Sequence, residues 1–176
     1  ICGSGLVSLV SALVRVGTIL PSGSFNLESP NSRLRQGPGG VEYVLAEEST
    51  TSTGRDLVFT HQDLAQLQLA KAAIHAGISL MMVEMGVDRL AKVLLAGAFG
   101  NYLDAEAACG INMLPGVSPA QIECAGNAAG AGAVMMLMSH SQRVRAEMLA
   151  DRMQYFELAV HPGFSDAFID GMPFTP

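Results

Sequence analysis

An apolar run that ends abruptly in small residues, residues 93–101 (VLLAGAFGN), constrains the fold of this chain more than any other segment. Four consecutive apolar residues without helical spacing predict a strand over 93–96 that is buried on both faces of a parallel sheet. Gly97 and Gly100 then end the strand. Such an ending leaves bare backbone at the carboxyl edge of the sheet, where open α/β folds bind their ligands. A tight turn without a ligand explains the same residues, so the neighbouring segments must decide.

A second strand with the same kind of ending is predicted over 121–125, followed by Gly126 and Asn127. The next residues have Gly or Ala at almost every position and predict a helix, although each Gly costs about 1 kcal/mol of helix propensity relative to Ala. Close packing of this helix on the sheet would offset that cost, with the methionines after Val134 as core gap-fillers. Gly126 and Asn127 lie at the amino end of this predicted helix, which is open to solvent or ligand. Close packing explains these two residues less well than a ligand does.

The strongest helix signal begins at Thr60 and Asp63, which form a capping pattern, and ends at Gly86. Its predicted apolar stripe consists of Leu64, Leu67, Ala70, Ile74, Ile78, Met81 and Met85. A polar stripe at steps of three and four residues consists of Gln68, Lys71, His75 and Ser79. A solvated helix face accounts for this stripe, and we expect Lys71 to have no role in the core.

The remaining patterns alternate between helices and strands, which predicts an α/β layered domain. Ser4 is the expected N-cap of a first helix that ends near Gly17, and residues 21–40, rich in Pro, Gly and Ser, predict a flexible surface excursion. The further predicted elements are a hairpin of strands 41–45 and 56–59, a polar turn at Asn101, Tyr102 and Asp104, helices 105–109, 141–152 and 164–169, and a strand over 155–159.

Composition narrows the function classes. The 176 residues are 49% hydrophobic and 15% charged, enough apolar content for one well-buried core. A net charge of −6 without a Lys/Arg cluster argues against a nucleic-acid or anionic membrane partner. The three cysteines lack C-x-x-C spacing, which favours a reducing compartment, and we expect a cytoplasmic protein. The chain begins at Ile1 rather than Met, so we expect a piece of a longer protein.

Five segments, in order, resemble the carboxyl-terminal domain of reductive activators of corrinoid proteins. They are ICGSGLV at 1–7, GRDLVFT at 54–60, QLQLAKAAI at 66–74, LAGAFGNYL at 95–103 and GNAAGAGA at 126–133. The resemblance covers nearly the whole chain. It implies an actin-like ATPase fold, similar to that of sugar kinases, with a ribonuclease H-like layered sheet and flanking helices. Residues 1–176 would form a single domain, the second lobe of the ATPase.

The same resemblance implies a function for the longer protein. Members of the family use ATP to drive electron transfer from an upstream [2Fe-2S] domain onto an inactive Co(II) corrinoid, which restores Co(I). The implied cofactors are ATP or ADP with Mg²⁺ and the upstream cluster. The implied partner is a corrinoid protein or a corrinoid-dependent methyltransferase, and a homodimer is compatible with the family.

The implied nucleotide site lies on the small residues of the two strand ends and on the polar stripe. Ala96, Gly97 and Ala98 match the turn on which the adenosine lies. Gln68, Lys71 and His75 match, by their spacing, a helix face that flanks the nucleoside in chaperone-type relatives of the family.

Beside Gly126, two amides, Asn101 and Asn127, would orient the ligand through few polar contacts. No catalytic residue or metal ligand is assigned to this chain. The acidic phosphate turns of the family are not found in it, so we expect this piece alone not to hydrolyse ATP efficiently.

Two other classes of function remain compatible with the sequence. One is a noncatalytic nucleotide-binding module, or a docking or dimerisation module. The other is an unrelated small-molecule enzyme that uses the Gly97 and Gly126 crevice with His75 or Asp104 as a base. No paired carboxylates, Ser/His/Asp set or metal-spaced histidines support the enzyme.

Overall fold

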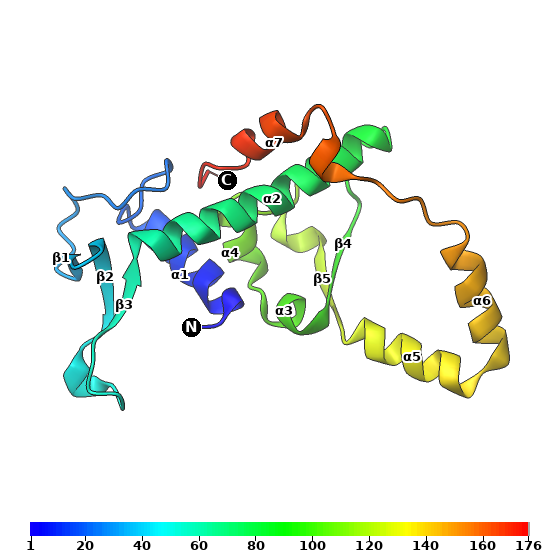
Figure 1. Cartoon of the computed structure of the whole chain (residues 1–176), viewed down its shortest axis with the longest axis horizontal. Helices are drawn as coiled ribbons and strands as arrows, with labels where there is room; N and C mark the ends of the chain where they lie inside the picture. Colours follow the sequence, from blue (N-terminus) through cyan, green and yellow to red (C-terminus); the bar gives the residue numbers. More distant parts are fainter. Residues whose placement is uncertain (176) are drawn as a thin grey trace.

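The computed structural model describes residues 1–175, and within them it has seven helices, five strands and three 3-10 turns (Figure 1). The helices are α1 (Gly3–Arg15), α2 (His61–Glu84), α3 (Gly97–Tyr102), α4 (Ala105–Gly110), α5 (Ala128–Met138), α6 (His140–Ala150) and α7 (Phe164–Asp170). The strands are β1 (Leu34–Gly37), β2 (Gly40–Ala46), β3 (Leu57–Thr60), β4 (Val93–Ala96) and β5 (Ile122–Gly126). The 3-10 turns are Glu48–Thr50, Pro119–Gln121 and Leu158–Val160.

Helix α2 is the longest helix in the described part of the chain, and α7 packs along it (Figure 1). Its start is the predicted capping box: the Thr60 hydroxyl accepts from the Asp63 N–H, and the Asp63 carboxylate accepts from the Thr60 N–H. Its end is also as predicted, because Gly86 has a φ of 62°, which favours glycine. Both termini of this helix are therefore set by local sequence.

The buried face of α2 differs from the predicted apolar stripe. Leu64 and Leu67 are buried, but Ile74, Met81 and Met85 are exposed. Beyond Leu67 the buried residues of this helix are mostly small or polar: Gln68, Lys71, Ala72, Ala76, Gly77 and Leu80. The buried side of α2 is therefore set by the segments that pack on it and not by its large apolar residues.

The first sheet is an antiparallel meander of β1, β2 and β3, which confirms the predicted hairpin. Its register shifts by one residue between Val44 and Ala46, where β2 bulges opposite β3. The third strand, β1, lies inside the 21–40 segment that the sequence predicts as a surface excursion. That segment also sends Phe25 into the core, where its ring meets Phe59 edge-on at a centroid distance of 6.1 Å.

Helix α1 supplies much of the core, through Val7, Val10 and Leu13. The expected N-cap is wrong by two residues: Cys2 precedes the helix, and Ser4 lies buried in the first turn. The reason is that the Leu6 N–H already donates to the Cys2 carbonyl at 3.0 Å. The rest of the buried cluster is Ile19, Phe25, Phe59, Leu64, Leu67, Leu103, Ala107, Ala108, Ile111, Met113, Leu114 and Phe174.

The second sheet is a parallel pair, β4 and β5. Parallel pairing of the two predicted strands is confirmed, but burial on both faces is wrong, because the Leu94 side chain is 61% exposed. The predicted polar turn after β4 is also wrong at Asn101 and Tyr102, since both belong to α3. Parallel sheets are normally covered on both faces, so this pair presents an unusually open apolar surface.

Helices α5 and α6 form an arm that projects away from the body (Figure 1). The expected close packing of α5 on the sheet is wrong: none of its residues is buried, and a Cβ at Gly132 would meet nothing within 4 Å. Met135, Met136 and Met138 are exposed rather than core residues. The predicted strand over 155–159 is also wrong, because residues 153–157 have no regular structure and a 3-10 turn follows. In the described part of the chain, no helix is both long and apolar enough to cross a bilayer.

Candidate functional site

The carboxyl ends of β4 and β5 meet at one edge of the parallel pair. Ala96 pairs directly with Gly126, so the turn that follows each strand starts at the same level. The two turns each lead at once into a helix, α3 at Gly97 and α5 at Ala128. The structure thus brings the two predicted glycine-ended strands together.

Glycine at these ends is required by backbone conformation rather than by crowding. Gly97 has a φ of 85° and Gly126 a φ of 65°, values that residues with a Cβ rarely adopt. A Cβ built on either residue would have nothing within 4 Å. The space above both turns is therefore open, and no bulky side chain fills it.

The polar groups at this edge come from amides. Asn127 is the N-cap of α5, where its Oδ1 accepts from the Gly130 N–H at 3.0 Å. Asn101 is an exposed residue of α3. Ala96 and Ala98 are exposed as well, so this edge offers backbone, small side chains and two amides, and none of these side chains is charged.

The amino end of α1 lies beside α3. A Cβ on Gly3 would be 2.9 Å from the Phe99 ring, so a side chain at Gly3 would displace that ring. The first turns of α1 and α3 are therefore neighbours. Free N–H groups at helix starts attract anions and polar ligand atoms.

Gln68 and Lys71 are not part of this edge, and the expectation that they line a solvated stripe is wrong. Both are buried, and their polar atoms bind the C-terminal tail. His75 is half-buried, and its Nδ1 lies 3.0 Å from the Asn112 carbonyl. The face of α2 that carries these residues is an interior face, because α7 and the tail cover it.

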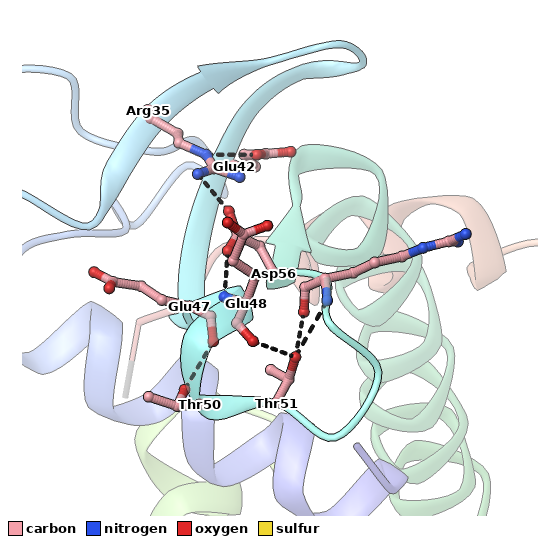
Figure 2. Close-up of polar contacts among 8 residues, drawn as sticks. Arg35, Glu42, Glu47, Glu48, Thr50, Thr51 and Asp56 are labelled. Atoms are coloured by element: carbon pink, nitrogen blue, oxygen red, sulfur yellow. Dashed lines mark hydrogen bonds and ion pairs between the residues drawn. The ribbon is translucent and has the colours of Figure 1, made fainter.

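Sequence reasoning missed a polar network at the tip of the first sheet (Figure 2). The Arg35 guanidinium joins the Glu42 and Asp56 carboxylates at 2.8 and 2.7 Å, and Asp56 also accepts from the Glu48 N–H. The two carboxylates raise the pKa of Arg35, Glu42 first, while Arg35 and then the Glu48 N–H lower the pKa of Asp56. The Thr51 hydroxyl ties the loop by contacts with Arg55 and Glu48.

This network borders a hollow with a volume of about 1020 Å³, which is larger than the groove of about 400 Å³ between α1 and α4. The charged groups of the network already pair with one another, so the network acts as a structural brace for the hairpin. No sequence pattern links Arg35 to carboxylates 7 and 21 residues away, since only the strand register brings them together. The described residues hold no cluster of three or more His, Cys, Asp or Glu side chains that suits a metal ion.

Comparisons with known proteins identify the family of this chain. A family model described as the C-terminal domain of RACo, the ASKHA domain, matches residues 1–176. The corrinoid activation enzyme RamQ of Eubacterium limosum is 30% identical over 177 residues, which cover 96% of this chain and 30% of RamQ.

A solved structure is similar over almost the whole chain. It is a reductive activator for corrinoid, iron-sulfur protein, with a TM-score of 0.89 and 34% identity, over 99% of this chain and 28% of that one. The chain thus spans less than a third of the length of either relative. The fold expectation, an actin-like ATPase lobe, is confirmed, and the chain belongs to the family of C-terminal ASKHA domains of RACo.

Proposed function

We propose that this chain is the part of an ATP-dependent reductive activator that holds the adenosine side of the nucleotide. The observation that carries the proposal is the shared edge of β4 and β5, where Ala96 pairs with Gly126 and the space above Gly97 is open. A flat purine and its ribose need close approach to backbone and few polar contacts, and this edge offers both.

The residues proposed to contact adenosine are those at the edge. They are Ala96, Gly97, Ala98, Asn101, Gly126 and Asn127. Gln68 and Lys71 are left out because the tail occupies their polar atoms, and His75 because its Nδ1 is engaged by Asn112. This restricts the nucleoside site to the two glycine-ended turns.

The wider activity rests on the family and on the names of the two relatives. We propose that the longer protein uses ATP with Mg²⁺ to drive an electron from an upstream [2Fe-2S] domain onto Co(II) in a corrinoid protein or corrinoid-dependent methyltransferase. The phosphate-binding and metal-binding groups would lie in the upstream part. The three free cysteines fit a reducing, cytoplasmic setting.

Calorimetry on the full-length protein tests the nucleoside site. Gly97→Val should weaken ATP binding by at least about tenfold, because the side chain enters the open space above the turn. Gly86→Val is the matched control: Gly86 also has a positive φ and open space, but it precedes the amino end of β4, at the far end of the sheet. Both variants incur similar strain, so only loss of binding specific to Gly97→Val supports the site.

A second variant separates steric exclusion from strain. Ala98 lies inside α3 and is exposed, so Ala98→Leu adds bulk at the edge without a strained backbone. It should also weaken ATP binding while leaving the melting temperature within a few degrees of wild type. Unchanged affinity in both edge variants would reject the placement of the nucleoside.

A docking role is the second candidate, and exposed apolar surface favours it. Leu94 on β4 and Val134 and Leu137 on α5 are more than half exposed. In this second candidate, a corrinoid protein docks on this exposed apolar surface. Full ATP affinity in both edge variants, together with loss of corrinoid-protein binding in Leu137→Ser, would favour docking over nucleotide binding.

A further inference from the structure

The C-terminal tail, residues 171–174, runs across α2 and surrounds the side chain of Lys71. The Lys71 ammonium donates to the Gly171 carbonyl at 2.7 Å and to the Pro173 carbonyl. Its Nζ also lies 5.0 Å from the centre of the Phe174 ring, within the range of a cation–π contact. Lys71 is fully buried, so these three groups take the place of water around the charge.

Gln68 makes the second attachment, one turn earlier on α2. Its Nε2 donates to the Met172 carbonyl and to the Ser22 carbonyl, both at 3.0 Å. The Phe174 N–H donates to the Pro21 carbonyl at 2.8 Å. The tail therefore ties α2 to the loop after α1, through contacts between residues about 50 to 150 positions apart.

The fit of the tail is close. A Cβ on Gly171 would lie 3.0 Å from the His75 Cβ and 3.1 Å from the Ala72 carbonyl, so a side chain here would force α2 or the tail to shift by a few tenths of an ångström. Phe174 is 1% exposed and belongs to the main core cluster. The Lys71 contacts are built from backbone carbonyls and one ring, with no carboxylate among them.

We propose that residues 171–174 form a latch on α2, held by hydrogen bonds from the side chains of Lys71 and Gln68. This tail, rather than a nucleotide, is the ligand of both side chains. The inference does not rest on the proposed function. The latch fixes the C-terminal tail, α7 and the loop at 21–24 against α2. When the latch opens, the Lys71 amine becomes accessible to solvent.

The chain offers an internal reference for a test, because Lys71 and Lys92 are its only lysines. The Lys92 side chain is 52% exposed and pairs with Glu123 at 2.7 Å. Acetylation of the full-length protein with N-hydroxysuccinimidyl acetate, read by mass spectrometry of the two peptides, should modify Lys71 at least about tenfold more slowly than Lys92. Equal rates would overturn the latch.

Variants of the tail sharpen the result. Removal of residues 171–176 should bring the Lys71 rate to within about twofold of the Lys92 rate. If the truncated protein fails to fold, Phe174→Leu takes its place. This variant keeps an apolar core residue but removes the ring face, and it should raise the Lys71 rate by several-fold. A Lys71 rate unchanged by Phe174→Leu, with the fold retained by circular dichroism, would contradict the role of the ring.

Nucleotide provides the decisive competitor. If the tail alone holds Lys71, saturating ATP leaves the Lys71 rate in the wild type unchanged. Protection of Lys71 by ATP would make it a nucleotide ligand and overturn the latch. This outcome is distinct from failure of the nucleoside site, which the Gly97→Val affinity reports separately.

Discussion

The stability of the protein should depend on pH through Lys71, and Lys71→Met should remove that dependence. Burial lowers the pKa of Lys71 from its ordinary value of 10.5 to about 8. The folded chain therefore releases this proton near pH 8, whereas the unfolded chain keeps it to about pH 10.5. Between these values the unfolded state binds more protons, so the free energy of unfolding rises with pH.

The size of the effect follows from the width of that window. Each pH unit corresponds to about a tenfold change in the unfolding equilibrium, which gives at most about 3 kcal/mol between pH 8 and 10.5. This is an upper limit, because the Gly171 and Pro173 carbonyls and the Phe174 ring favour the charged amine. Below pH 8 the cost of burying the charge is fully present, and above pH 10.5 it is absent.

The assay is urea unfolding of the whole protein, followed by circular dichroism at four pH values from 7.5 to 10.5. Methionine has a similar length, and it leaves the tail carbonyls without a donor to the same extent at every pH. Burial raises the pKa of the Cys109 thiol, and Glu157 raises that of Tyr155, so both groups lower stability as pH rises. Both groups are present in each protein and cancel in the difference. Parallel pH profiles for wild type and Lys71→Met would refute the reasoning.

Three further predictions concern the fold. Thr60→Ala removes the cap of α2 and should cost about 1 kcal/mol in urea unfolding, and a loss below about 0.3 kcal/mol would contradict the role of the capping box. Phe59→Ala empties a fully buried core site and should cost about 3 to 5 kcal/mol in the same assay, whereas a cost near 1 would mean that the core refills the space. Arg35→Met should raise the pKa of Asp56 toward its usual value of 3.8 in an NMR titration, and an unchanged value would show that the Glu48 N–H alone holds it low.

Elements whose signals are local could be predicted from the sequence. The capping box at Thr60, the end of α2 at Gly86 and the glycine ends of β4 and β5 each depend on a few adjacent residues, and the structure has all of them. The meeting of Gly97 and Gly126 at one edge was also predictable, since parallel strands share their carboxyl end.

Burial could not be predicted to the same extent, because it depends on distant partners. Lys71 lies on a polar stripe by spacing, yet its acceptors are 100 and 102 residues away. The usable signal was the set of small residues Ala72, Ala76 and Gly77, all of which are buried on α2. Large apolar residues of α5 suggested a core, but none of the residues of that helix is buried.

The latch and the nucleoside site constrain each other. With Lys71 held by the tail, the proposed adenosine edge has only uncharged side chains, and the cation nearest in sequence, Lys92, precedes β4 at the opposite end of the sheet, paired with Glu123. An edge of this kind suits the neutral nucleoside, and we propose that charged groups elsewhere in the longer protein bind the phosphates. Free adenosine should therefore compete for this site with an affinity nearly independent of salt, whereas ATP affinity in the full-length protein should fall as salt rises. An ATP affinity as independent of salt as that of adenosine would contradict the assignment of phosphate binding to charged groups outside this edge.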